Sequence, residues 1–153
     1  MKKLSHSLAS ASLGLLLAGA AFAATQGSPI KVEHGWVRWL PANLPAAGYA
    51  VIRNDGDQPV KLTGADSGDY GMAMLHRSMQ KGGKDTMAMV DTLSIPAHGE
   101  VKLAPGGYHF MLMSAKHPIK PGDTVTIDLH FDNQETLEVS WPVRPANATG
   151  PND

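Results

Sequence analysis

The sequence predicts an all-β domain of the Greek-key sandwich or barrel class. Short runs rich in β-branched and aromatic residues recur along the chain, with turn residues about every 8–12 positions. The chain contains 16 glycines and 11 prolines, which suits a fold with many turns. No run shows the 3.6-residue periodicity of a long amphipathic helix. The length of 153 residues fits one domain.

Four strands are expected in the first half of the chain. Residues 30–40 form an apolar, aromatic run that ends at the Pro-rich sequence PANLP. Residues 47–54 end at NDGDQP, a strong turn sequence. Residues 60–66 alternate apolar and polar side chains, and 73–79 run up to the turn QKGGKD. The intervening segment SGDYG, 67–71, is short enough to hold only a helical turn.

Five strands are expected in the second half. Residues 86–95 end at the turn PAHG, and 100–105 lead into a Pro-Gly-Gly turn. Residues 108–114 alternate, and the segment AKHPIKPGD separates them from 124–132. The last strand is expected over 136–143. The tail that follows, RPANATGPND, is polar and rich in turn formers, so we expect it to be frayed over about 144–153.

The N-terminus has the pattern of a secretory signal peptide. Lys2 and Lys3 precede an apolar run, which ends in the small-x-small sequence Ala21-Phe22-Ala23. The apolar run is short for a membrane span of about 20 residues, and no other stretch qualifies. We therefore expect residues 1–23 to be a signal peptide and 24–153 to be a single exported domain without a membrane span.

Composition excludes several function classes. The chain has no cysteine, so it can form neither a disulfide nor a thiolate metal site of the blue-copper type. Its formal net charge is −1, and without Lys2 and Lys3 it is more negative, so nucleic acid is not an expected partner. The catalytic patterns GxSxG and HExxH are missing from the sequence, and we do not expect an enzyme.

Methionine and histidine form the most informative pattern. Apart from Met1, all seven methionines lie between Met72 and Met113. Three expected strands place Met or His at every second position, which puts them on one face. The sets are Met72, Met74 and His76; Met87 and Met89; and His109, Met111 and Met113. Thioether and imidazole ligands select a soft ion such as Cu(I), whereas zinc prefers thiolate, imidazole and carboxylate.

Simpler explanations compete with this one. A single methionine usually fills a gap in a core, and a single histidine is usually structural or exposed. A metal-free extracytoplasmic interaction module with a methionine-lined groove would produce the same composition. From the residues alone, a structural role and a copper site remain about equally favoured.

The spacing of four of these residues resembles a known motif. His76 is followed after ten residues by Met87, then after twenty-one by His109 and after one more by Met111. With the blocks GWVR, AAGYAVIRNDGD, IPAHGEVKLAPGGYHFMLM and IKPGDTV, this pattern resembles the periplasmic copper chaperone family PCu(A)C. The resemblance covers roughly residues 30–143.

The resemblance implies both a fold and a function. The fold would be a cupredoxin-like Greek-key β-sandwich, and the Cu(I) ligands would be His76, Met87, His109 and Met111. A monomer in the periplasm would deliver copper to the CuA domain of cytochrome c oxidase subunit II, or to another copper-accepting assembly protein. Copper storage or resistance would use the same site. Cu(II) would bind weakly, because the tail lacks the His and Met that serve it in some relatives.

Overall fold

A computed structural model describes residues 27–42 and 44–153, and the expected signal peptide lies outside these residues. Within them the chain forms strands, turns and bends. The described part contains no helix with the length and apolar character needed to cross a membrane.

Ten strands make up the domain. They are β1 (Ile30–Arg38), β2 (Ala46–Asn54), β3 (Val60–Ser67), β4 (Tyr70–Lys81), β5 (Lys84–Met89), β6 (Leu93–Ile95), β7 (Gly99–Leu103), β8 (Tyr108–Ala115), β9 (Thr124–Phe131) and β10 (Thr136–Arg144).

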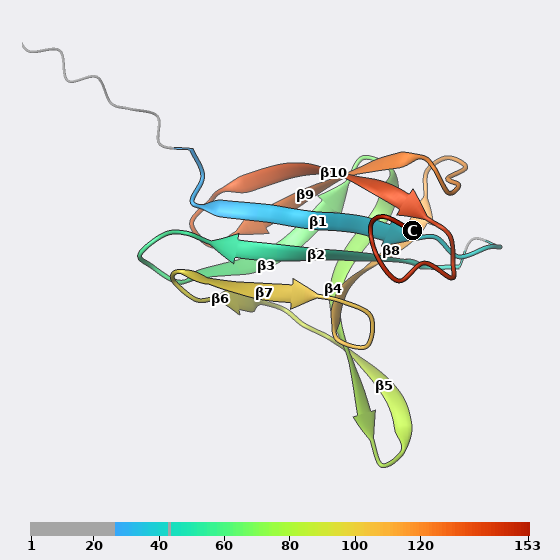
Figure 1. Cartoon of the computed structure of the whole chain (residues 1–153), viewed down its shortest axis with the longest axis horizontal. Coiled ribbons are helices and arrows are strands. Elements are labelled where there is room, and N and C mark those ends of the chain that lie inside the picture. The colour runs from blue at the N-terminus through green and yellow to red at the C-terminus, as the bar shows by residue number, and fades with distance from the viewer. Residues whose placement is uncertain (1–26, 43) are drawn as a thin grey trace, which may run out of the picture.

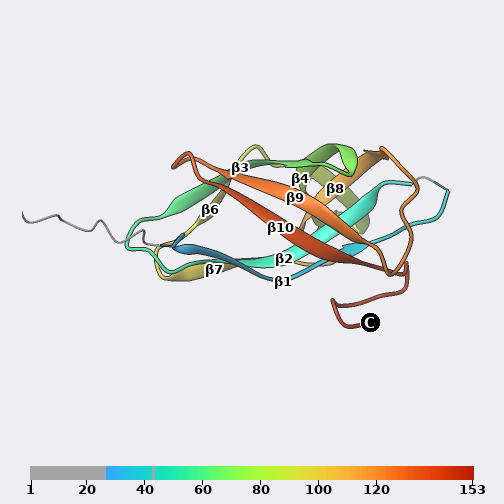
Figure 2. The ribbon, with the colours of Figure 1, turned by 90° about the horizontal axis from the view of Figure 1, so that it is seen from above.

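The strands form one continuous sheet that folds over on itself. Its order is β5-β4-β8-β7-β2-β1-β10-β9-β3-β6, and additional pairings join β4 to β3 and β8 to β2. Most neighbours are antiparallel, whereas β1 pairs with β10, and β7 with β8, in parallel. Figure 2 shows β3 and β9 lying opposite β1, β2 and β7 as the two layers of a sandwich. The hairpin of β4 and β5 projects from this body (Figure 1).

The core lies between the layers and follows the alternation of the strands. Phe110 and Leu112 of β8, Ile52 of β2 and Ile127 and Leu129 of β9 are fully buried. Because successive side chains of a strand point to opposite faces, the neighbours of Phe110 and Leu112 must lie on the outer side of β8. Those neighbours are His109 and Met111 of the motif, together with Met113.

Two details differ from the expected strand pattern. The run 86–95 contains two strands, because β5 pairs with β4 and β6 pairs with β3. The backbone N–H of Val90 donates to the carbonyl of Leu75, and this contact ends the β4–β5 ladder. No helical turn occurs over 67–71; instead, the Ser67 hydroxyl accepts from the N–H groups of Asp69 and Tyr70 at the β3–β4 connection.

The C-terminal segment, for which the sequence predicts fraying, lies against the sheet. Ala148 is buried against Trp36 and Tyr49. Arg144 Nε donates to the carbonyl of Pro151 at 2.6 Å. The tail therefore covers part of the outer face of β1 and β2.

Candidate metal site

The outer face of β4 and β8 carries three directly opposed pairs of soft side chains. The antiparallel register sets Met72 opposite Met113, Met74 opposite Met111, and His76 opposite His109. Directly opposed residues of an antiparallel pair project from the same face, with Cβ atoms about 4.5–5.5 Å apart. The two histidine rings lie 6.0 Å apart between centroids, at an interplanar angle of 64°. The structure therefore brings together the two predicted histidines, which are 33 positions apart in the sequence.

Strand β5 adds the methionines of the second set to this face. Met89 is opposite His76, and Met87 is opposite Ser78, which follows His76 on the same face. Both methionines are exposed, Met87 by 50% and Met89 by 63%. Thus Met87 lies two residues along the ladder from the His76–His109 pair, on the projecting hairpin (Figure 1).

A tight turn sets the position of His109 at the start of β8. The Gly107 N–H donates to the Ala104 carbonyl at 2.9 Å, and Gly106 has a φ of 82°. Pro at the second position and Gly with positive φ at the third are the signature of a type II turn. The sequence Ala-Pro-Gly-Gly therefore reverses the chain between β7 and β8 and places the Gly107 carbonyl oxygen near the ring of His109.

His109 is held in a defined tautomer by this turn. Its side chain is 6% exposed, and Nδ1 lies 3.2 Å from the Gly107 carbonyl oxygen. Because a carbonyl only accepts, Nδ1 must carry the proton and donate. Nε2 of neutral His109 then has a free lone pair, which is the form that binds a metal.

His76, unlike His109, has no hydrogen bond that fixes its ring within the described part of the chain. Among the described residues, neither of its two buried ring nitrogens has a hydrogen-bond partner. Burial lowers the pKa of His76, and the neighbouring His109 lowers it further. His76 is therefore neutral at pH 7, with its hydrogen-bonding capacity unused.

A pocket of about 480 Å³ opens beside these histidines. Met87, His109 and Met111 line it together, with Tyr49 and Arg38 from the adjoining strands. The Arg38 guanidinium lies 5.3 Å from the centroid of the Tyr49 ring, within cation–π distance. Burial raises the pKa of Tyr49, and Arg38 opposes this rise. Three of the four motif residues thus share one opening, and the fourth, His76, lies beside His109.

Arg38 and Tyr49, which line this pocket, were not predicted as part of the site, nor was Trp36, which packs against Tyr49. Tyr49 lies 6.3 Å from His109 and 4.8 Å from Trp36 between ring centroids, so the aromatic row continues the histidine pair across β2 and β1. Alternation places Trp36 and Arg38 on one face of their strand. Only the register between β2 and β8, which pairs Gly48 with Phe110, reveals that this face adjoins His109.

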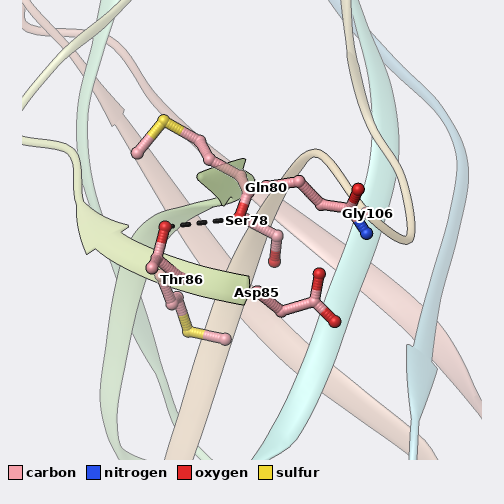
Figure 3. A pocket seen from close by; sticks show the side chains of 7 residues that line it. Ser78, Gln80, Asp85, Thr86 and Gly106 are labelled. Carbon is pink, nitrogen blue, oxygen red and sulfur yellow. Dashed lines mark hydrogen bonds between the residues drawn. The ribbon is translucent and has the colours of Figure 1, made fainter. Parts of the chain in front are cut away.

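A second pocket, of about 550 Å³, lies along the outer half of the hairpin, next to Gly106 of the β7–β8 turn. Figure 3 shows Ser78, Asp85, Thr86 and Gly106 around it, and Met87 also lines it. The Thr86 hydroxyl donates to the Met79 carbonyl at 3.2 Å. Met87 therefore borders an opening on both of its sides and is accessible to an incoming molecule.

The other candidates lie apart from this face. Arg77 projects from the opposite face of β4, 5.1 Å from the Tyr108 ring centroid. Three histidines outside the motif each lie 2.8 Å from an aspartate oxygen, in the pairs His98–Asp57, His117–Asp69 and His130–Asp66. Within the described ranges, no group of three or more His, Asp or Glu is positioned to hold a metal ion.

A family model described as "Putative lipoprotein LpqE-like" matches residues 30–143, which is most of the chain. The chain belongs to the LpqE-like family. A relative from Leifsonia xyli subsp. xyli, named "Putative lipoprotein Lxx21020", is 30% identical over 128 residues, covering 83% of this chain and 76% of the relative.

Two solved structures are similar to this chain in fold and in sequence. The Cu(I) form of DR1885 from Deinococcus radiodurans is 37% identical, with a TM-score of 0.65, and the match covers 85% of this chain and 87% of that protein. The apo PCuAC domain of PmoF2 is 26% identical, with a TM-score of 0.67, and the match covers 80% of this chain and 95% of that domain. The cupredoxin-like β-sandwich is thereby confirmed, and the predicted PCu(A)C resemblance is supported.

Proposed function

We propose that this LpqE-like protein is a copper chaperone that binds Cu(I) through His76, Met87, His109 and Met111. Residues 24–153 would act as a single domain in the periplasm, after removal of the signal peptide. The acceptor would be the CuA domain of cytochrome c oxidase subunit II, or another copper-accepting assembly protein.

The observation that carries the proposal is the pairing of His76 with His109. A metal–nitrogen bond is about 2.0 Å long, so a ring centroid lies about 3 Å from a bound ion. Two rings that share an ion therefore have centroids within about 6 Å of each other, and these two are 6.0 Å apart. An ion between them would also satisfy a buried nitrogen of His76 that has no partner among the described residues.

The chemistry of the donors favours Cu(I). His109 offers Nε2, because Nδ1 donates to Gly107. Two neutral imidazoles and two neutral thioethers leave the ion with its single positive charge, and soft sulfur ligands select Cu(I) over oxygen-seeking ions. The presence of Cu(I) in the structure of DR1885, 37% identical, supports this choice.

The uneven burial of the ligands suggests how copper would leave. His109 is 6% exposed, whereas Met87 is 50% exposed on the projecting hairpin. An incoming ligand from an acceptor would displace the Met87 thioether first, while the two imidazoles keep the ion. The copper would then pass to the acceptor by associative exchange, driven by the acceptor's higher affinity.

A competition titration with a colorimetric Cu(I) chelator tests the site. We expect His76→Ala and His109→Ala each to weaken Cu(I) binding at least about a hundredfold, because each removes one of four ligands. His98→Ala is the matched control, since His98 is exposed and pairs with Asp57 away from this face. Unchanged affinity in either site variant would remove that histidine from the site.

Delivery is tested separately, by mixing the Cu(I)-loaded protein with a purified apo CuA domain. Appearance of CuA absorption after oxidation is the expected result. Copper that stays on the protein would favour storage or resistance instead. A thermal midpoint that Cu(I) does not raise under reducing conditions would favour a metal-free interaction module, because a tightly bound ligand must stabilise the fold.

A further inference from the structure

Three methionines beyond the histidines, Met72, Met74 and Met113, have no role in the proposed chaperone site. Met72 is opposite Met113 and lies two residues before Met74 on the same face of β4. None of these three residues belongs to the His76, Met87, His109 and Met111 set. Met72 is 47% exposed, which is unusual for a large apolar side chain. Met74 and Met113 are partly exposed.

Their geometry resembles a ligand set more than a packing cluster. Directly opposed Cβ atoms are about 4.5–5.5 Å apart, and diagonal neighbours are about 7–8 Å apart. Methionine has three rotatable side-chain bonds, so sulfurs that start from these positions reach a common point. The core-facing neighbours Ala73 and Leu112 pack inward, and the thioethers are therefore not required to fill the core.

We propose that Met72, Met74 and Met113 form a second site, built only of thioethers, that binds a monovalent soft ion such as Cu(I) or Ag(I). Three neutral sulfurs hold such an ion without releasing protons. They discriminate against divalent ions that prefer oxygen or nitrogen.

The two sites are adjacent and have no ligand in common. The Met72–Met113 pair lies four residues along the strand from the His76–His109 pair, about 13 Å at about 3.3 Å per residue, and ions at the two centres would be closer than this because Met74 of one site is opposite Met111 of the other. Repulsion between the two positive ions is screened by salt on the exposed face, with a Debye length of about 8 Å at physiological ionic strength, so the second ion is expected to bind more weakly than the first. Met74 of the second site is directly opposite Met111 of the first, and Met74 also borders a pocket shared with Met89. Thioethers therefore run without a break from one site to the other.

The test is a titration of the purified protein with Ag(I), followed through the carbon-13-labelled methyl groups of its methionines by NMR. Ag(I) is monovalent and soft, and it does not change oxidation state. The first equivalent is expected to shift Met87 and Met111, and the second to shift Met72, Met74 and Met113. Because this comparison uses the unaltered sequence, it does not depend on a variant that folds. A second equivalent that leaves the methyl groups of Met72 and Met113 unmoved would overturn the proposal.

Variants separate this proposal from the chaperone site. Replacing Met72, Met74 and Met113 by Leu should weaken the second equivalent at least about tenfold while the first is kept. The control is Met79→Leu, because Met79 is 41% exposed on β4 but its odd position places it on the opposite face. The double variant His76→Ala with His109→Ala should still bind one Ag(I) at the methionines. Loss of all binding in that variant would refute an independent thioether site, whatever it implies for the histidines.

Discussion

His76 provides a sharp prediction, because a metal ligand and a structural histidine respond in opposite ways to the same substitution. Replacing His76 by Leu removes two buried ring nitrogens that have no hydrogen-bond partner among the described residues. Leucine places an apolar side chain of similar size beside His109. We therefore expect the apo protein to become more stable and the affinity for Cu(I) to fall.

The magnitude follows from the cost of an unpaired polar group. A buried donor or acceptor without a partner costs about 1–3 kcal/mol. His76 as a residue is only partly buried, so the lower limit applies, and we expect a gain of about 1 kcal/mol. For a domain of this size, that gain raises the midpoint of thermal unfolding by roughly 4 °C.

The gain should grow as the pH falls. Burial and the proximity of His109 lower the pKa of His76 in the folded protein. The unfolded chain therefore takes up a proton near pH 6.5 that the folded chain resists, and the wild type loses stability as the pH falls through this value. The leucine variant has no such group, so its advantage should be larger at pH 5.5 than at pH 7.5.

The assay is urea and thermal unfolding of both proteins in the presence of a copper chelator, at the two pH values. His109→Leu is the control. Its Nδ1 donates to the Gly107 carbonyl, which also accepts from the Ser78 N–H, so its removal loses one of two hydrogen bonds to that carbonyl and should not stabilise the fold. If His76→Leu destabilises the apo protein by as much as His109→Leu, His76 is a structural residue and the reasoning is refuted.

Three further predictions concern the fold, its pH dependence and copper transfer. Gly35→Ala should destabilise the protein by about 1–3 kcal/mol in urea unfolding, because the new Cβ would lie 2.1 Å from Trp141 Nε1; an unchanged midpoint would contradict this packing. The hydrogen bond to Asp69 raises the pKa of His117, and the Pro118 carbonyl raises it further. The His117–Asp69 pair therefore stabilises the fold fully below about pH 6.5, and this stabilisation is lost as the pH rises through the raised pKa. His117→Gln should therefore flatten the pH dependence of the unfolding midpoint between pH 6 and 8, and an unaltered profile would exclude the pair as its source. Met87→Leu should speed the loss of Cu(I) to a chelator in stopped-flow measurements while largely preserving the histidine-bound ion, and an unchanged rate would exclude Met87 as a ligand.

Much of the fold was predictable because the strands alternate strongly and end at unambiguous turn sequences. Phe110 and Leu112 alternate with His109, Met111 and Met113, so the alternation by itself assigns the inner and outer faces of β8. The run 86–95 was wrongly predicted as one strand. Its apolar residues continue through Val90, and only the tertiary partners of its two halves, β4 and β3, differ.

The juxtaposition of the candidate site could be expected only from the motif spacing. Alternation places His76 and His109 on outer faces, but register decides whether they meet, and no local signal fixes the register between strands so far apart in the sequence. For the same reason the sequence does not predict that Tyr49 and Arg38 line the pocket, because this depends on the pairing of β2 with β8. That the His76 nitrogens have no hydrogen-bond partner within residues 27–42 and 44–153 is a property of packing, and the sequence carries no signature of it.

X-ray absorption of the protein loaded with one equivalent of Cu(I) tests the central claim most directly, because it counts the neighbours of the metal. The proposed site predicts two nitrogen and two sulfur neighbours, with one sulfur lost in Met111→Leu. A copper environment of oxygen and nitrogen alone, or one that Met111→Leu leaves unchanged, would contradict the assignment of His76, Met87, His109 and Met111.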